Sequence, residues 1–337
     1  MNKQLKTALV GLGITAAVTG VGALLADGVN RTLAKSALNR EAPKIVQKMN
    51  LMPKGYQLEE ETLKLSAEAR EKLEAQPLET VTIESFDGTK LVGHLCRAAQ
   101  QKRVLLAMHG WRSTWSRDFG VIAPFWEENG CTVLFAEQRG QGESDGEYMG
   151  FGMVERFDCV EWLKWLNQNG FENVPIYLVG LSMGATTVLM ASGSDELSQN
   201  VRGVIADCGF TSAQEILQYV IEKNSKISYR LHGRGINRNY RRKIHFDADG
   251  YSTLDALAVT DVPVLLIHGS ADNFVPVQMS FDNFKACKSP KKLLVVDGAG
   301  HGLSYLVDQN GYEKAVLEFF ATNDNFGAQE DGGSCLN

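Results

Sequence analysis

Residues 180–184 read Gly-Leu-Ser-Met-Gly and hold a serine hydroxyl between two glycines, directly after an apolar run. Gly-x-Ser-x-Gly in this setting is typical of a nucleophile elbow, in which the serine lies on a strained turn between a strand and a helix. Glycine at both flanking positions lets neighbouring backbone approach closely. The pattern is weak by itself, so Ser182 becomes a candidate nucleophile only if an acid and a base follow it.

Two later strand ends supply those groups. Asp272 follows the apolar run 262–267 in a polar loop, and His301 lies in a glycine-rich loop after the run 293–296. In this interpretation His301 takes the Ser182 proton, while Asp272 orients the imidazole and stabilises the imidazolium that forms. The sequence therefore predicts acyl transfer through a covalent acyl-serine intermediate.

A tetrahedral oxyanion also needs hydrogen-bond donors. The backbone N–H of Met183, the residue after the nucleophile, is the first expected donor. The second is the backbone N–H of Trp111, in the loop after the apolar run 104–108, where Gly110 allows close approach. We expect Trp111 and Met183 to form the oxyanion hole.

Each of these assignments has a rival. Ser182 could be a structural serine in a tight turn, and Asp207, which also ends an apolar run, competes with Asp272 as the acid. Of the two, we favour Asp272. The other histidines lie in predicted strands, strand ends or an insert, and we assign none of them as the base: His94, His109, His232, His245 and His268.

Taken together, the motifs resemble those of the α/β-hydrolase superfamily, and more narrowly those of bacterial serine hydrolases related to the prolyl-oligopeptidase and BEM46-like groups. The resemblance covers roughly residues 79–320. It is carried by His109-Gly110, Arg139-Gly-Gln-Gly-Glu-Ser144, Gly180-Leu-Ser-Met-Gly184, Asp207-Cys-Gly-Phe-Thr-Ser, His268-Gly-Ser-Ala-Asp272 and Gly300-His301-Gly302. One departure is Glu137, where many relatives carry an aspartate, but the loop it opens is structural as a rule.

Hydrophobic periodicity supplies the elements that must position these residues. Strands are predicted at 80–84, 91–97, 104–108, 132–136, 176–179, 201–206, 264–267 and 293–296, and helices at 119–129, 154–169, 183–192, 277–287 and 312–320. Alternation of strand and helix predicts a mostly parallel eight-stranded sheet with helices on both faces. The Asp-Gly turn between the first two strands predicts an antiparallel hairpin at one edge. The fold class is therefore α/β, as an α/β-hydrolase fold with a small lid insert.

Composition excludes several classes of function. The chain has 337 residues, 44% of them hydrophobic, and a net charge of −6, which argues against a nucleic-acid partner. His-Glu-x-x-His and Cys-x-x-Cys motifs are missing, so we predict no metal and no cofactor. The six cysteines show no paired spacing and are expected to be reduced.

The amino-terminal region suggests a membrane segment. Residues 7–26 are uncharged, and as a helix of about 30 Å they would be long enough to cross a bilayer. We favour a signal anchor within a segment 1–29, with a cleaved signal peptide as the main alternative and a buried helix as the third. Basic residues downstream favour a cytoplasmic catalytic domain under the positive-inside rule. Secretion after cleavage is the alternative location.

The remaining segments complete the expected domain organisation. Residues 30–78 are expected to be a helical linker, 79–321 the catalytic domain and 322–337 a disordered tail. The lid, at about 210–260, contains a basic cluster made of Lys223, Lys226, Arg230, Arg234, Arg238, Arg241, Arg242 and Lys243. This cluster is either a solvated face or a contact for anionic lipid headgroups or an acidic substrate.

The function predicted from these residues is hydrolysis of a small-molecule carboxylic ester or other acyl substrate by a Ser-His-Asp triad. A serine peptidase of the aminopeptidase or prolyl-oligopeptidase type is the first alternative, because it uses the same triad. A catalytically inactive, membrane-tethered binding protein is the second. The sequence leaves the acyl group and the leaving group open.

Overall fold

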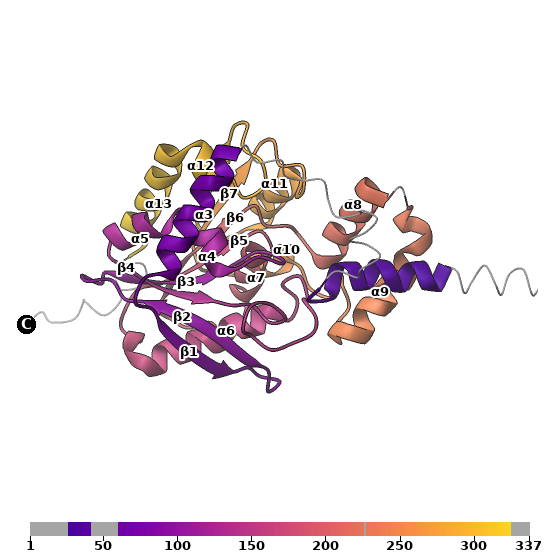
Figure 1. Ribbon diagram of the computed structural model, residues 1–337, viewed down its shortest axis with the longest axis horizontal. Helices are drawn as coiled ribbons and strands as arrows, with labels where there is room; N and C mark the ends of the chain where they lie inside the picture. The colour runs from indigo at the N-terminus through magenta and orange to yellow at the C-terminus, as the bar shows by residue number, and fades with distance from the viewer. Residues whose placement is uncertain (1–25, 42–59, 226, 325–337) are drawn as a thin grey trace, which may run out of the picture.

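The computed structural model describes residues 26–41, 60–225 and 227–324 (Figure 1). Among these residues, none of the helices combines the length and the apolar character that crossing a membrane requires. The predicted apolar segment 7–26 lies outside the described residues except for its last position, and so does the tail beyond residue 324.

One sheet of eight strands forms the centre of the fold, in the order β1-β2-β4-β3-β5-β6-β7-β8. The pairs from β4 to β8 are parallel, whereas β1 pairs with β2 and β2 with β4 antiparallel. This confirms the predicted mostly parallel sheet with a hairpin at one edge. The strands are β1 (Glu79–Glu84), β2 (Lys90–Cys96), β3 (Arg103–Met108), β4 (Cys131–Ala136), β5 (Ile176–Leu181), β6 (Val201–Asp207), β7 (Val264–Gly269) and β8 (Lys291–Val296).

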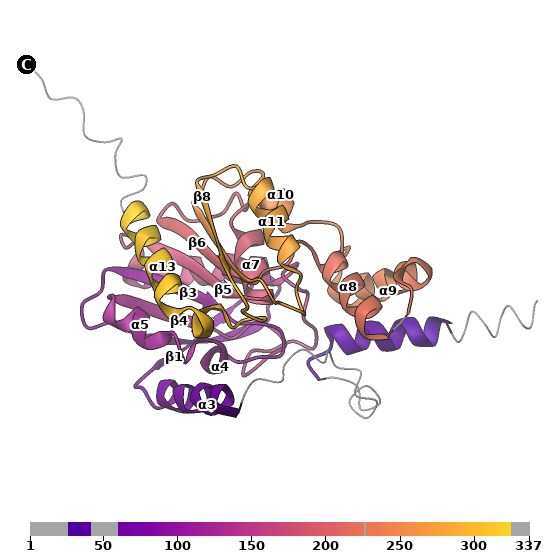
Figure 2. The same cartoon turned by 90° about the horizontal axis from the view of Figure 1, so that it is seen from above.

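Helices cover both faces of the sheet (Figure 2). On one face, α6 (Glu155–Leu166), α7 (Met183–Ala191), α10 (Thr253–Leu257) and α11 (Val277–Ala286) bury a first apolar cluster. On the other, α3 (Glu60–Glu74), α4 (Trp115–Phe119), α5 (Ala123–Glu128) and α13 (Gln309–Asn323) bury a second. Leu105 and Leu106 illustrate the division, because these consecutive β3 residues belong to different clusters. Strands buried on both faces require this continuous apolar character.

The lid projects from the carboxyl edge of the sheet. It contains α8 (Ala213–Ser225) and α9 (Tyr229–Ile244), and a helix over residues 26–38 lies beside α9 (Figures 1 and 2). These three helices share a third apolar cluster with the loop that carries Met149, Phe151 and Met153. Two smaller elements, the turn η1 (Asn167–Phe171) and α12 (Ser304–Val307), complete the described part of the chain.

A buried ion pair fastens the edge hairpin to the rest of the sheet. Arg139 donates from Nε and Nη2 to the two carboxylate oxygens of Asp158, at 2.6 and 2.5 Å. It also donates from Nη1 to Asp87 in the hairpin turn, at 2.8 Å. The side chain of Asp158 is almost completely buried. The Arg-Gly-x-Gly-x-Ser loop therefore has a structural role, as its motif predicts.

Replacing Arg139 by alanine should destabilise the protein by about 3–5 kcal/mol, because it leaves the Asp158 carboxylate buried without its cation. The measurement is the free energy of unfolding in urea. Arg97→Ala is the matched control, since Arg97 pairs with Glu79 at 3.1 Å on the surface and both side chains are more than half exposed. The control should cost less than about 1 kcal/mol. Equal losses in the two variants would contradict a structural role for the Arg139 network.

Candidate active site

Ser182 lies on a sharp turn between β5 and α7, at backbone angles φ 55° and ψ −115°. A methyl group added at Gly184 would lie 1.8 Å from the carbonyl oxygen of Met108, and one added at Gly180 would lie 2.3 Å from the backbone of Gly184. Both glycines are therefore needed for close backbone approach at this turn. The Ser182 N–H donates to the carbonyl oxygen of Asp207 at 2.8 Å, which ties the turn to β6.

The structure brings Ser182, His301 and Asp272 into one hydrogen-bonded chain. His301 Nε2 lies 2.8 Å from the Ser182 Oγ, and His301 Nδ1 lies 2.7 Å from Asp272 Oδ2. The three residues follow β5, β7 and β8, whose carboxyl ends meet at one edge of the sheet. Ser182 is only 6% exposed, so its hydroxyl lies in a largely water-excluded environment.

Four groups hold the Asp272 carboxylate. Oδ1 accepts the backbone N–H groups of Phe274 and Val275, at 2.7 and 2.9 Å. Oδ2 accepts from His301 and also lies 3.2 Å from Nε2 of His268. Burial alone would raise the pKa of Asp272, but the hydrogen bonds from His268 and His301 outweigh it and hold that pKa well below its usual range. Asp272 is therefore ionised at neutral pH and able to stabilise an imidazolium.

His268 is a residue whose place at the site the sequence did not reveal. Its Nδ1 lies 2.6 Å from the Ser280 hydroxyl, and its Nε2 lies 3.0 Å from the carbonyl oxygen of Val275 and close to Asp272. A ring with its proton on Nε2 satisfies all of these partners, because Nδ1 then accepts the Ser280 hydroxyl.

The carboxylate that lies 2.7 Å from Nδ1 of His301 belongs to Asp272, whereas Asp207, the rival acid, is buried at the end of β6. Its carboxylate accepts instead from the Ser304 hydroxyl at 3.1 Å. Burial raises the pKa of Asp207 to about 6. The imidazole of His301 thus pairs with Asp272, and Asp207 binds the neighbouring Ser304.

Cys208 lies against the same network. Its sulfur, one carboxylate oxygen of Asp272 and one ring nitrogen of His301 lie within 4.8 Å of one another, the single such group of possible metal ligands found in the described residues. Burial raises the pKa of the Cys208 thiol well above its usual value. Asp272 and His301 already use these atoms in a hydrogen bond to each other. We therefore assign these residues no metal.

The two expected oxyanion donors flank the serine. Met183 is the first residue of α7, so its N–H has no partner within the helix. Gly110, next to Trp111, passes so close to the nucleophile that an added methyl group would lie 3.5 Å from Cβ of Ser182. The Gly110 N–H donates to Asp118 at 2.7 Å, which fixes the loop.

The helix over residues 26–38 and the turn after it hold the oxyanion loop from outside. The indole Nε1 of Trp111 donates to the carbonyl oxygen of Ala37 at 2.9 Å. Nη2 of Arg112 donates to the carbonyl oxygens of Ser36 and Asn39, at 2.9 and 2.7 Å. The segment that the sequence suggested as a linker thus includes a part of the wall of the site.

Changing Trp111 to phenylalanine should lower kcat for an ester substrate about tenfold, because small displacements of catalytic donors are costly. The change removes the hydrogen bond to Ala37 and keeps an aromatic ring. The control is Trp165→Phe in α6, since Trp165 belongs to the packing of the opposite sheet face. A melting temperature lowered without any change in kcat would contradict the positioning role of the Ala37 contact.

Aromatic side chains pack beside the triad. Phe274 packs on His301 with ring centroids 5.0 Å apart and stacks on Trp111 at 6.4 Å. Phe151 lies between Trp111 and Phe210, at 6.3 and 6.1 Å. Phe151 and Phe210 belong to the apolar cluster of the lid with Met183, and Trp111 and Phe274 pack against it. The neighbourhood of Ser182 is therefore suited to an apolar group.

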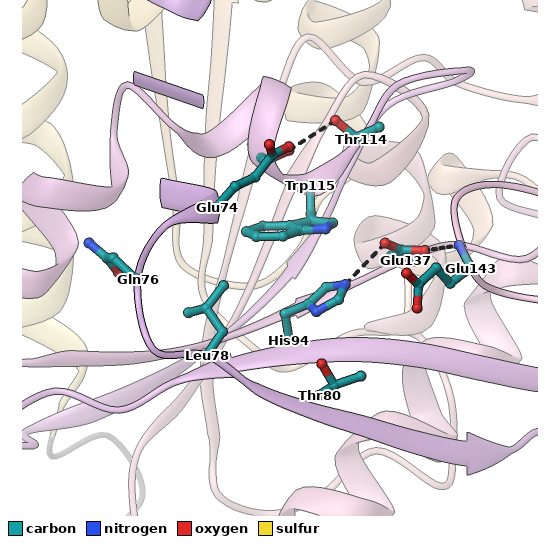
Figure 3. Close-up of a pocket in the computed structure, with 10 residues that line it drawn as sticks. Glu74, Gln76, Leu78, Thr80, His94, Thr114, Trp115, Glu137 and Glu143 are labelled. Atoms are coloured by element: carbon teal, nitrogen blue, oxygen red, sulfur yellow. Dashed lines mark hydrogen bonds and ion pairs between the residues drawn. The ribbon is translucent and has the colours of Figure 1, made fainter. Parts of the chain in front are cut away.

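A separate polar pocket lies between the end of α3, the strands β1 and β2, α4 and the loop after β4, with a volume of about 400 Å³ (Figure 3). His94 pairs with Glu137 at 3.0 Å and packs against the ring of Trp115 at 4.5 Å. Glu137 also accepts the N–H of Glu143. Glu137, which stands where many relatives carry an aspartate, therefore holds the two ends of the loop 137–143 together. None of the triad residues lines this pocket.

Comparison with known proteins gives a family and a set of relatives. The model of the prolyl oligopeptidase family matches residues 117–325. The uncharacterized protein YqkD of Bacillus subtilis is 28% identical over 56% of this chain, and the alignment covers 62% of YqkD, which is less than two thirds of its length. The uncharacterized protein YfhR of Escherichia coli K12 is 24% identical over 72% of this chain and 80% of YfhR.

Solved structures show the same fold. The esterase Pf2001 of Pyrococcus furiosus superposes with a TM-score of 0.61 at 21% identity, covering 75% of this chain and 94% of Pf2001. The α/β hydrolase GrgF of Penicillium superposes with a TM-score of 0.58 at 20% identity, covering 74% of this chain and 100% of GrgF. At these identities the similarity establishes an α/β-hydrolase fold.

Proposed function

Because the chain belongs to the prolyl oligopeptidase family and is a hydrolase of the α/β-hydrolase type, we propose that it cleaves carboxylic esters through an acyl-Ser182 intermediate. The observation that carries this proposal is the hydrogen-bonded chain from Ser182 through His301 to Asp272. Nucleophile, base and orienting acid are all within hydrogen-bonding distance, which is the arrangement that nucleophilic acyl transfer requires.

The proposed reaction has two half-reactions, acylation of Ser182 and hydrolysis of the acyl-enzyme, and His301 transfers the protons in both. His301 takes the Ser182 proton as Oγ attacks the ester carbonyl, and Asp272 stabilises the resulting imidazolium. The N–H groups of Trp111 and Met183 donate to the oxyanion. His301 then protonates the departing alcohol. In the second half-reaction it activates a water molecule that releases the acid and restores the serine.

Two observations favour an ester over the free amino terminus of a peptide. The aromatic rings around His301 suit an apolar acyl group. The lid glutamates are already engaged, since Glu215 accepts from the Thr211 hydroxyl and Glu222 from the backbone N–H of Tyr229. A serine aminopeptidase would need free carboxylates in the lid to recognise the amine.

The test is to treat the full chain with a fluorophosphonate probe, map the adduct by mass spectrometry and assay p-nitrophenyl esters of graded acyl length beside aminoacyl p-nitroanilides. We expect an adduct on Ser182 and turnover of the esters. Labelling with turnover of the anilides alone would replace the ester proposal by the peptidase. Absence of labelling in folded protein would favour a binding role.

A further inference from the structure

A row of arginines lies on the outer face of α9 in the lid. Arg230, Arg234, Arg238 and Arg242 follow one another at intervals of four residues, and all four side chains are exposed. Successive members of such a row are rotated by only about 40° around a helix axis. The four guanidinium groups therefore share one side of α9, which we call the arginine row.

Internal ion pairs do not neutralise the arginine row. The α9 sequence contains six basic residues and no acidic residue. Arg241 pairs with Asp247, and Lys243 lies over the ring of Tyr148. No salt bridge between described residues involves any member of the arginine row. In a chain with a net charge of −6, this helix face is a local concentration of positive charge.

An apolar side chain stands beside the arginine row. Leu231, which follows Arg230, is 80% exposed, the highest value among the exposed large hydrophobic residues that the structure describes. Val29 is a second exposed apolar residue, and it lies on the helix over residues 26–38. A leucine held in water beside arginines gains free energy if a partner with both charged and apolar parts covers it.

The helix that lies beside α9 follows the uncharged run 7–25 directly in the sequence. The helix over residues 26–38 lies beside α9 (Figures 1 and 2), and Asn30 Oδ1 lies 2.7 Å from Nδ1 of His232. The chain enters that helix directly from the uncharged run. The arginine row, Leu231 and the point where an apolar segment joins the fold are therefore on neighbouring helices.

We propose that α9 docks the lid on an anionic lipid surface. The arginine row would contact the headgroup phosphates, and Leu231 would enter the boundary between headgroups and acyl chains. A bilayer matches both features, because it offers many negative charges in one plane above an apolar layer. A nucleic acid would match the arginines but would leave Leu231 in water.

Vesicle flotation tests the proposal on the full chain. Vesicles are made of phosphatidylcholine alone or of equal parts of phosphatidylcholine and phosphatidylglycerol. We expect stronger binding to the anionic vesicles, and raised salt should remove the difference. Binding to the neutral vesicles measures any contribution of the uncharged run, so the difference between the two compositions isolates the arginine row. Ser182→Ala should bind identically, which separates docking from hydrolysis.

The decisive variant changes all four members of the arginine row to glutamine. Each basic residue near an anionic surface is worth about fivefold in binding, so the preference for anionic vesicles should fall at least about a hundredfold. The matched control, with the same change in net charge, replaces four exposed lysines elsewhere by glutamine and should keep the preference: Lys64, Lys72, Lys102 and Lys314. Circular dichroism checks that both variants are folded.

Three outcomes would overturn the proposal. The first is an unchanged anionic preference in the arginine variant, and the second is an equal loss in the lysine control. The third is an arginine variant that still prefers anionic vesicles but no longer binds duplex DNA, which would assign the face to nucleic acid. If the fourfold variant does not fold, the single variants Arg234→Gln and Leu231→Ala replace it, and each should bind anionic vesicles more weakly than the parent. Normal binding to anionic vesicles by both single variants would also overturn the proposal.

Discussion

Replacing Ser182 by alanine should abolish labelling by the fluorophosphonate and lower kcat for p-nitrophenyl esters by about 10⁵–10⁶-fold. The covalent route requires an oxygen nucleophile at this position, and the Ser182 Oγ lies 2.8 Å from Nε2 of His301. Alanine should keep the fold, because a serine and an alanine face the same backbone strain at φ 55°. The measurements are single-turnover and steady-state rates with the melting temperature.

Ser192→Ala is the matched control for this loss. Ser192 is also buried and lies at the other end of α7, where its hydroxyl donates to the carbonyl oxygen of Leu189. We expect full labelling and nearly normal kcat in this variant, with a small loss of stability. If Ser182→Ala kept more than a small fraction of ester turnover, the acyl-serine mechanism would be wrong.

Exchanging Asp272 for asparagine should reduce kcat by about 10⁴-fold while the protein stays folded. Asparagine can present its NH₂ group to His301 and so favours the wrong tautomer, and it cannot stabilise the imidazolium. In addition, Oδ1 would still accept the N–H groups of Phe274 and Val275, so the loop should keep its shape. The assay is the same ester turnover, with near-ultraviolet circular dichroism as a check on packing.

Asp207→Asn is the discriminating control. In the parent protein, the stability that Asp207 contributes should depend on pH in the opposite sense to that of a carboxylate in an ordinary ion pair. Burial raises the pKa of Asp207 to about 6, so between about pH 4 and 6 the folded protein binds more protons than the unfolded chain. The stability contributed by Asp207 therefore falls as pH rises through that window. Asparagine removes this loss, and the variant should be at least as stable as the parent at pH 7.

The two aspartate variants together decide which carboxylate is the acid. We expect nearly normal kcat for Asp207→Asn, because the Asp207 carboxylate accepts from the Ser304 hydroxyl, whereas Nδ1 of His301 lies 2.7 Å from Asp272. A large loss of kcat in Asp207→Asn with a normal rate in Asp272→Asn would reassign the acid to β6. Unfolding curves at pH 4, 5, 6 and 7 provide the stability comparison.

Local sequence was sufficient for the eight strands and for the turn that carries Ser182. All eight predicted strands are present with ends shifted by at most two residues, because buried parallel strands have apolar side chains on both faces. The nucleophile turn was readable because only glycine fits at 180 and 184. The predicted helix 119–129 is wrong, because the structure has two helices there, α4 and α5. Gly120 caps the end of α4 by donating its N–H to the carbonyl oxygen of Ser116, and Pro124 lies in the first turn of α5.

Tertiary structure alone decided what surrounds these residues. The sequence placed Asp207 and Asp272 at equivalent strand ends, and only the path of the His301 loop brings the imidazole to Asp272. Likewise, the contact of His268 with Asp272 and the support of Trp111 by Ala37 join residues whose pairing no periodicity encodes. A strand or a tight turn depends on residues that are neighbours in the sequence. The position of a lid helix depends instead on side chains from several distant elements, so the sequence alone does not reveal it before the whole chain has packed.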